Sequence, residues 1–377
     1  MPFYFARKCN RLHKKLGTLI EIVYFRQQSR FNSKMRHPEK EVTIYDIARK
    51  LNLSAATVSR GLKNNPAINQ TTRKKIAAAA DEMGYRFNSF ASNLRRQRTD
   101  TIGVIVPRLN SNFMSEALAG MEKAASEAGY NLIISQSHES MIKERKNAAT
   151  MFNSRVDGLL VSLSYDTTSM EHFAPFIKKG IPLLFFDRAS GYKNSPSIII
   201  DNFKAAYEIV SHLIGEGCSN IVHITGNQSR DIYKKRFEGY KRALEDHTIP
   251  FRDDLVFINN LSRQEGAAAA EEILKRPQLP DGIFAANDVC AISCMQTLKQ
   301  NGIKIPADIA IAGFNNDYIS TVAEPNLTTI NYPAFELGEA AAKTLIQQLT
   351  NSSDLENENA LILKHQLIVR ESTRKRQ

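Results

Sequence analysis

The chain has 377 residues, of which 42% are hydrophobic and 24% are charged. This length and composition exclude a disordered protein and suggest two or three domains with buried cores. The formal net charge of +11 is unevenly distributed: residues 1–40 carry +8, residues 41–100 carry +6 and residues 101–377 carry −3. The basic first quarter therefore indicates a polyanionic partner, and the remainder does not.

Residues 1–40 form a basic extension without helical or strand periodicity. Two interpretations stay open for this segment. It can be an arm that contacts nucleic acid, or an upstream extension of the start codon, because Met35 lies just before the first clear helix signal.

The first regular pattern follows Val42. Apolar residues recur at the i, i+3, i+4 and i+7 spacing of one short helix: Ile44, Ile47, Ala48 and Leu51. Thr43 is a suitable N-cap for it. Asn52 stands where the chain must reverse, and Asn tolerates a left-handed backbone.

Two further helices complete this head. Ser54 is a suitable N-cap for a second helix over residues 55–63, and Asn69 for a third that ends at Gly84. Two helices joined by three or four residues make a helix-turn-helix. A three-helix bundle with no role in nucleic-acid binding is the alternative. The tight spacing, the local positive charge and the small residues at the start of the second helix favour DNA binding.

Beyond Thr101 the pattern changes to short β-branched runs that alternate with amphipathic helices. We expect strands over residues 101–107, 131–135, 156–163, 181–186, 220–225, 255–258, 281–286 and 309–314. Such near-continuous apolar strands predict an α/β fold of parallel sheets covered by helices on both faces, and the length predicts two similar lobes. Ligands of such folds bind outside the carboxyl ends of the strands.

Other classes of protein find little support in the sequence. Dinucleotide-binding, P-loop, nucleophile-elbow and zinc motifs are missing, so we expect no enzyme activity, no cofactor and no metal. The four cysteines make no disulfide framework, and no stretch matches a membrane span or a cleavable signal peptide. The chain is therefore expected in the cytoplasm. These features also disfavour a periplasmic binding protein, and the large acidic remainder disfavours a nucleoid protein without a sensor.

From Val42 onward the chain resembles the lactose-repressor/galactose-repressor (LacI/GalR) family. The segment VTIYDIARKLNLSAATVSRGLKNNPAINQTTRKKIAAAADEMGY matches that family's DNA-binding signature at almost every motif position. The resemblance implies that Ala55 and Ala56 select the operator and that Arg60 contacts a base. It further implies residues that hold phosphates or orient the recognition helix: Tyr45, Ser54, Thr57, Ser59 and Asn69.

The segment after the head resembles the family's hinge helix. The resemblance assigns Asn88, Ala91 and Leu94 to it, with the leucine inserted into the minor groove of the operator. Phe87 stands where the family usually has proline. A plain interdomain linker is the alternative. The position directly after the head and the basic residues Arg95, Arg96 and Arg98 favour the hinge helix.

The remainder resembles the family's periplasmic-binding-protein-like sensor. The resemblance implies these effector-binding residues: Asn112, Phe113, Asp187, Arg188, Arg236, Asn287, Asp288 and Asn315. Their carboxylates, amides and guanidiniums suit a polyhydroxylated ligand such as a sugar. Asp187 and Arg188 can instead be an ordinary ion pair at a strand end. Asn315 replaces a frequent aspartate of the family, and Leu261 replaces an aromatic that often stacks on sugars.

The domain organisation follows from these assignments. We expect a basic extension at 1–40, a DNA-binding head at 41–86, a hinge at 87–100 and a sensor at 101–377. Within the sensor, we expect one lobe from about 101–200 with 331–358, and a second from about 201–330 with 359–377. The family implies a transcriptional regulator that acts as a homodimer on a near-palindromic operator and responds to a small-molecule effector.

Overall fold

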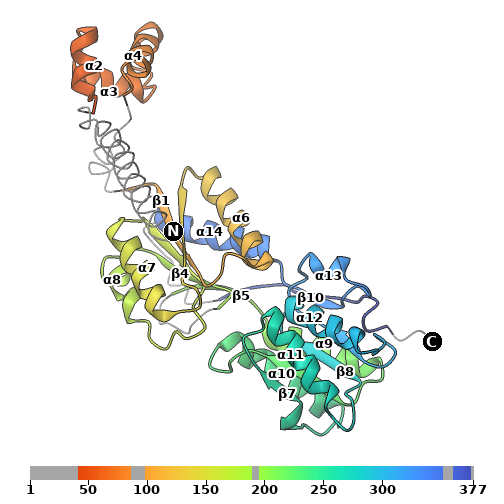
Figure 1. The fold of residues 1–377 in the computed structure, drawn as a ribbon. Helices are drawn as coiled ribbons and strands as arrows, with labels where there is room; N and C mark the ends of the chain where they lie inside the picture. The colour runs from red at the N-terminus through yellow and green to blue at the C-terminus, as the bar shows by residue number, and fades with distance from the viewer. Residues whose placement is uncertain (1–40, 86–97, 189–194, 351–359, 375–377) are drawn as a thin grey trace, which may run out of the picture. The chain divides into compact units, whose positions relative to one another are not determined.

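The structure is a computed structural model that describes residues 41–85, 98–188, 195–350 and 360–374. The chain divides into two compact units, Met1–Ser92 and Asn93–Gln377, which we call the head and the sensor. The head contains α2 (Ile44–Leu51), α3 (Ala55–Leu62) and α4 (Gln70–Glu82) (Figure 1). Its core is made by fully buried side chains from all three helices: Ile47, Val58 and Ile76.

The local signals at the ends of these helices are confirmed. Ser54 Oγ accepts a hydrogen bond from the Thr57 N–H at the start of α3, and the side chain of Asn69 caps α4. Asn52 has φ 53° and ends α2 in the left-handed region. Gly84 has φ +66°, and its N–H and that of Tyr85 donate to carbonyls in the last turn of α4.

The described part of the sensor alternates strands with helices. Its strands are β1 (Thr101–Val106), β2 (Asn131–Gln136), β3 (Gly158–Val161), β4 (Leu183–Phe186), β5 (Ser197–Ile200), β6 (Ile221–Thr225), β7 (Val256–Ile258), β8 (Gly282–Ala285), β9 (Ala310–Ala312), β10 (Thr329–Asn331), β11 (Leu361–Leu363) and β12 (Gln366–Ile368). Its helices are α6 (Asn112–Glu127), α7 (Met141–Asn153), α8 (Ala174–Lys178), α9 (Asn202–Gly215), α10 (Asp231–Asp246), α11 (Arg263–Leu274), α12 (Asp288–Gln300), α13 (Ile319–Val322) and α14 (Ala334–Thr350), with 3-10 turns η1 (Glu171–Phe173) and η2 (Asp253–Leu255).

Two parallel sheets organise the sensor, as the sequence predicts. A six-stranded sheet has the order β11-β5-β4-β3-β1-β2, and a four-stranded sheet has the order β7-β6-β8-β9. Helices α6 and α14 cover one face of the first sheet, and α7 and α8 cover the other. The second sheet lies between α9 with α10 and α11 with α12. We call these two layered bodies the first lobe and the second lobe.

Close backbone contact fixes the helices of the first lobe. A Cβ at Gly338 would lie 1.8 Å from the carbonyl oxygen of Ala117, and a Cβ at Gly120 would lie 2.0 Å from that of Phe335. Only glycine therefore allows α6 and α14 to approach at this distance.

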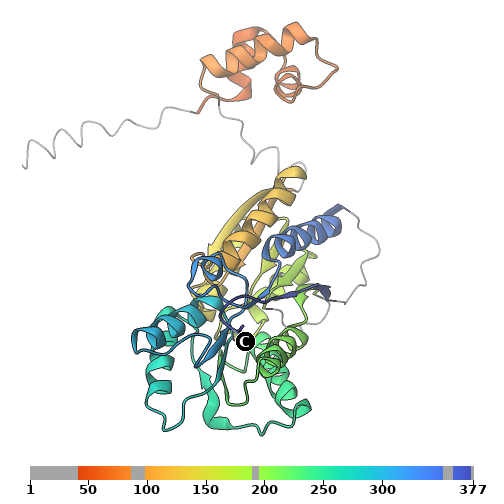
Figure 2. The same cartoon turned by 90° about the vertical axis from the view of Figure 1, so that its right-hand side faces the viewer.

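All eight expected strands are present, but four short ones were not predicted. These are β5, β10, β11 and β12, each of three or four residues. The antiparallel pair β10 and β12 runs between the two lobes (Figure 2). The expectation that residues 359–377 belong to the second lobe was wrong in part: β11 pairs with β5 in the first sheet, whereas Ser372 bonds to Ile311 and Asn326 of the second lobe. Strand β11 has only three residues, which is too short for the hydrophobic pattern to show which sheet it joins.

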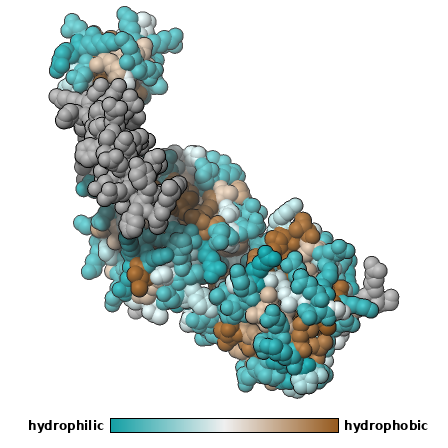
Figure 3. All heavy atoms as spheres, in the orientation of Figure 1, coloured by the Kyte–Doolittle hydropathy of each residue, from teal (hydrophilic) through white to brown (hydrophobic). Residues whose placement is uncertain are grey.

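The surface gives no sign of a membrane span. None of the helices in the described ranges is both long and apolar enough to cross a bilayer. Figure 3 shows hydrophilic residues over most of the visible described surface, with apolar residues gathered in small groups.

Candidate DNA-reading head and ligand cleft

Helix α3 presents two faces of different character. Val58 and Gly61 are buried against the head core, whereas Ala56 and Arg60 are exposed one turn apart. Residues at i and i+4 lie on the same face of a helix, so these two side chains share an accessible surface. This face has the composition expected of a recognition helix: small at its start, with an arginine one turn later.

The hydroxyls before and within α3 hold its first turn. Ser54 Oγ lies 2.8 Å from Thr57 Oγ1 and 3.1 Å from the Thr57 backbone nitrogen. Ser54 is exposed, and Thr57 is half-buried. Both residues therefore orient the N-terminus of α3 within the head itself. A role in holding DNA phosphates stays a prediction for them.

The remaining predicted DNA contacts lie on neighbouring elements or outside the described residues. Tyr45 on α2 is 65% exposed, which leaves its hydroxyl accessible. Ser59 and Ala55 are half-buried on α3. Asn69 Oδ1 accepts a hydrogen bond from the Thr71 N–H, so this amide already serves as a helix cap. The predicted hinge residues Asn88, Ala91 and Leu94 lie outside the described residues.

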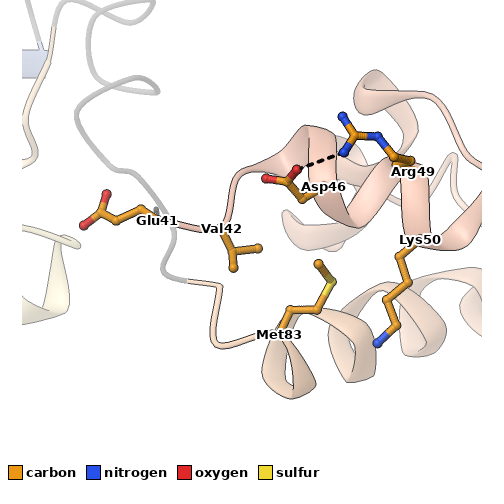
Figure 4. Close-up of a pocket in the computed structure, with 6 residues that line it drawn as sticks. All are labelled: Glu41, Val42, Asp46, Arg49, Lys50 and Met83. Carbon is orange, nitrogen blue, oxygen red and sulfur yellow. Dashed lines mark ion pairs between the residues drawn. The ribbon is translucent and has the colours of Figure 1, made fainter. Parts of the chain in front are cut away.

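A hollow on the head lies beside α2 and not on α3. It has a volume of about 450 Å³ and is lined by Glu41, Val42, Asp46, Arg49, Lys50 and Met83 (Figure 4). Asp46 and Arg49 form an exposed ion pair at 3.5 Å, and Asp46 Oδ2 also accepts from the Thr43 N–H and hydroxyl. These polar groups serve the start of α2, so the hollow has no converging set of groups that points to a ligand.

The sensor contains a cleft of about 520 Å³ at the carboxyl ends of strands from both sheets. Seven of the eight predicted effector residues line it: Asn112, Phe113, Asp187, Arg188, Arg236, Asn287 and Asn315. A cleft with convergent polar groups at this edge of parallel sheets is the usual place for a ligand. The structure thus brings together residues that are far apart in the sequence, while their binding role stays a prediction.

Asp187 and Arg188 follow β4 and line this cleft. Asp187 is 7% exposed, and its Oδ2 lies 3.4 Å from the Ser162 hydroxyl and 4.0 Å from Arg188 Nε. Burial raises the pKa of Asp187, and the charges of Arg188 and Arg236 only partly offset this effect. This carboxyl group is therefore under-solvated and would gain from hydrogen-bond donors on a ligand.

Arg236 on α10 is held rigidly from the second lobe. Its Nε donates to Asn202 Oδ1 at 2.9 Å, and its Nη1 donates to the Ala286 carbonyl at 2.7 Å. The guanidinium carbon lies 3.6 Å from the centre of the Phe314 ring. The side chain is thus fixed where it faces the cleft.

The three predicted asparagines differ in how many hydrogen bonds they already make within the protein. Asn287 caps α12 by accepting from the Cys290 N–H, and it donates to the Leu261 carbonyl. Asn112 is exposed, and its Nδ2 lies 3.5 Å from Asp317 Oδ1 of the second lobe. Asn315 is half-buried, and its backbone N–H donates to the Ile330 carbonyl.

Asp288 does not line the cleft. It is fully buried, and its two carboxylate oxygens accept from the Asp317 N–H at 2.7 Å and from the Thr329 hydroxyl at 2.6 Å. Burial and the nearby charge of Asp317 raise its pKa to about 7. The carboxyl group therefore ties α12 to the loop after β9 from inside the second lobe.

Glu139, which the sequence analysis missed, also lines the cleft. It follows β2 and receives two hydrogen bonds from Arg188, at 2.6 Å and 3.1 Å. Arg108 Nε lies 3.1 Å from Glu139 Oε1, and the Tyr165 N–H donates to Oε2 at 2.9 Å. Burial pushes its pKa upward, but the arginines outweigh burial and hold the pKa of Glu139 below its usual range.

Left-handed backbone marks the same cleft independently. Four non-glycine residues of its lining have positive φ: Glu139 (58°), Asp187 (58°), Leu261 (56°) and Asn315 (112°). Such conformations are unfavourable for residues with a Cβ, most of all for leucine, and tend to cluster at ligand sites.

Direct contacts join the two lobes beside the cleft. The Tyr165 hydroxyl of the first lobe accepts from the Asn227 N–H at 2.7 Å and donates to the Asn259 carbonyl at 3.2 Å. Arg230 of the second lobe donates to the Thr167 carbonyl. Among the described residues, no group of three or more His, Cys, Asp or Glu side chains could hold a metal ion.

Comparison with known proteins identifies the family of both parts of the chain. The family model "Bacterial regulatory proteins, lacI family" matches residues 43–88, and a periplasmic binding protein-like domain matches residues 210–373. Catabolite control protein A of Priestia megaterium is 33% identical over 334 residues, which cover 88% of this chain and 99% of that protein. The transcriptional repressor CytR of Escherichia coli K12 is 29% identical over 344 residues, 90% of this chain and 99% of that protein.

A solved structure supports the same conclusion. The transcriptional regulator CelR in complex with cellobiose has a TM-score of 0.66 and 26% identity, and the match covers 88% of this chain and all of that chain. A helix-turn-helix head with a two-lobed ligand-binding body defines an effector-controlled, DNA-binding transcriptional regulator. The chain belongs to the lacI family of bacterial regulatory proteins.

Proposed function

We propose that the protein is a homodimeric repressor that binds a near-palindromic operator and changes its DNA affinity when a sugar or sugar derivative occupies the sensor cleft. The observation that carries this proposal is the convergence of seven family-type effector residues on one cleft in a chain that also has the recognition helix. It acts by binding and not by catalysis.

The proposed domain roles follow the sequence boundaries given above. Residues 41–86 bind the major groove, residues 87–100 form the hinge, and the sensor supplies both the effector site and the dimer contacts. One head offers too few base contacts for a specific site, whereas two heads related by a twofold axis double them. The cellobiose bound to CelR supports a carbohydrate as the ligand class.

This function predicts three linked results for the full chain. Selection from random DNA should enrich a site with two inverted half-sites, and analytical ultracentrifugation should show a dimer. Titration with a panel of neutral mono- and disaccharides, read by fluorescence anisotropy on the enriched site, should change operator affinity for at least one sugar. Failure to enrich any site, or a monomer both with and without DNA, would refute the proposal.

Replacement of Arg60 by alanine should lower discrimination between the enriched site and random DNA. The loss of one bidentate base contact costs about 1–3 kcal/mol. Salt-sensitive binding to any DNA should remain. Lys74→Ala on α4 is the matched control because it also removes one exposed positive charge from the head. If Arg60→Ala keeps the discrimination of the Lys74→Ala control, Arg60 makes no base contact.

A further inference from the structure

Glu139 occupies an unusual position for an acidic side chain. It lies in the wall of the cleft with a side chain that is only 15% exposed, and its backbone is left-handed. A buried carboxylate is tolerated only where cations and hydrogen bonds compensate for lost hydration. Here the compensation comes from two arginines of the same cleft wall, Arg108 and Arg188.

The pairing with Arg188 uses the part of the guanidinium that would otherwise bind an anion. Arg188 Nη1 donates to Glu139 Oε2 at 2.6 Å and Nη2 donates to Oε1 at 3.1 Å. This parallel arrangement is the one in which arginine binds carboxylates and phosphates. Nη1 also faces the Leu163 carbonyl at 3.3 Å, so both terminal nitrogens of Arg188 are engaged within the protein.

The other arginines of the cleft lining differ from Arg188 in their contacts. Arg108 Nε lies 3.1 Å from Glu139 Oε1, and Arg236 donates to two neutral acceptors, the Asn202 side chain and the Ala286 carbonyl. Arg263 also lines the cleft, but it is exposed to solvent. An anionic ligand group that approaches Arg188 would therefore meet an arginine already paired with Glu139 and, beside it, the carboxyl group of Asp187.

We propose that Glu139 is a charge-selectivity residue, which neutralises Arg188 so that the cleft accepts uncharged polyhydroxylated ligands and rejects phosphorylated ones. This inference rests on the proposed function only in taking the cleft as the effector site. A phosphate would have to displace Glu139 from Arg188 and leave a buried carboxylate without its partner. A neutral sugar can donate hydroxyls to Asp187 and leave the ion pair intact.

The proposal predicts a gain of binding in Glu139→Gln. Glutamine keeps the shape and an acceptor for the Tyr165 N–H, but it leaves the charge of Arg188 uncompensated. The probes are inorganic phosphate and the pair ribose and ribose 5-phosphate, tested on the full chain by thermal shift at constant ionic strength. Relative to wild type, the variant should bind phosphate and ribose 5-phosphate roughly tenfold more tightly.

Matched variants distinguish a local effect at Arg188 from an effect of the changed net charge. Glu122→Gln makes the same change in net charge at an exposed position of α6 outside the cleft lining, and it should bind phosphate as wild type does. Arg188→Gln added to Glu139→Gln should abolish the gain. Glu139→Ala provides a second neutral variant if glutamine lowers the yield of folded protein.

Two outcomes would overturn the proposal. One is an Arg188-dependent stabilisation of the wild-type chain by phosphate or ribose 5-phosphate. The other is the same phosphate affinity in Glu139→Gln, Glu139→Ala and Glu122→Gln. Neither readout uses DNA. A chain that shows the predicted gain but no operator response to any sugar would retain this inference and contradict the proposed function.

Discussion

Replacement of Asp187 by asparagine should shift the operator response to a sugar effector to much higher sugar concentrations, while operator binding without effector should change little. Asp187 is a buried carboxyl group of the cleft lining, and burial raises its pKa more than the charges of Arg188 and Arg236 lower it. Ligand hydroxyls would donate to this carboxylate, and one such charge-assisted contact in a dry site is worth about 2–3 kcal/mol. Effector affinity should therefore fall roughly 30- to 150-fold.

Asparagine is the appropriate substitution at this position. It has nearly the shape of aspartate, and it tolerates the left-handed backbone that Asp187 adopts at φ 58°. Asp253→Asn makes the same chemical change at an exposed site on η2 outside the cleft lining. Operator titrations of both variants, with and without the sugar, provide the measurement. An unchanged effector response in Asp187→Asn would show that Asp187 does not bind the effector.

Local signals explain why the head could be predicted closely from the sequence. Ser54, Asn69 and Asn52 act on backbone groups within a few residues, so their types and spacing already contain the geometry. The long apolar runs of the sensor likewise predict parallel strands, because both faces of such sheets are buried. The strands β10 and β12 escape this approach because each has three residues, and their pairing joins segments that are distant in the chain.

The cleft shows where sequence reasoning stops. Glu139 lies between His138 and Ser140 in a polar loop, and its partner Arg188 is 49 residues away, so nothing local indicates the ion pair. Asn287 and Asp288 are adjacent in the sequence, yet only Asn287 lines the cleft. Asn287 is the N-cap of α12 and has an extended backbone, whereas Asp288 is the first residue of the helix. Asn287 therefore faces the cleft, whereas Asp288 points into the interior of the second lobe.

Asp288 can therefore be compared with Asp187, because both are buried aspartates and only Asp187 lines the cleft. Asp288→Asn should keep the effector response but change how stability depends on pH. Asp288 has a pKa of about 7 in the folded chain, and an aspartate in the unfolded chain titrates near 3.8. The folded state thus binds more protons than the unfolded state between about pH 4 and 7, so wild-type stability falls as pH rises through this window.

Asparagine removes this titration and retains the main contacts. Its amide oxygen can accept from the Asp317 N–H, and its amide nitrogen can donate to the Thr329 hydroxyl oxygen, the two groups that now meet the carboxylate. The free energy of unfolding of the variant, relative to that of wild type, should rise by on the order of 2–4 kcal/mol as the pH increases from 4 to 8. Urea unfolding of both proteins, followed by circular dichroism at pH 5, 6, 7 and 8, measures this gain. A stability difference that is independent of pH would show that Asp288 is ionised throughout this range. Loss of the effector response in Asp288→Asn would show that Asp288 contributes to effector binding.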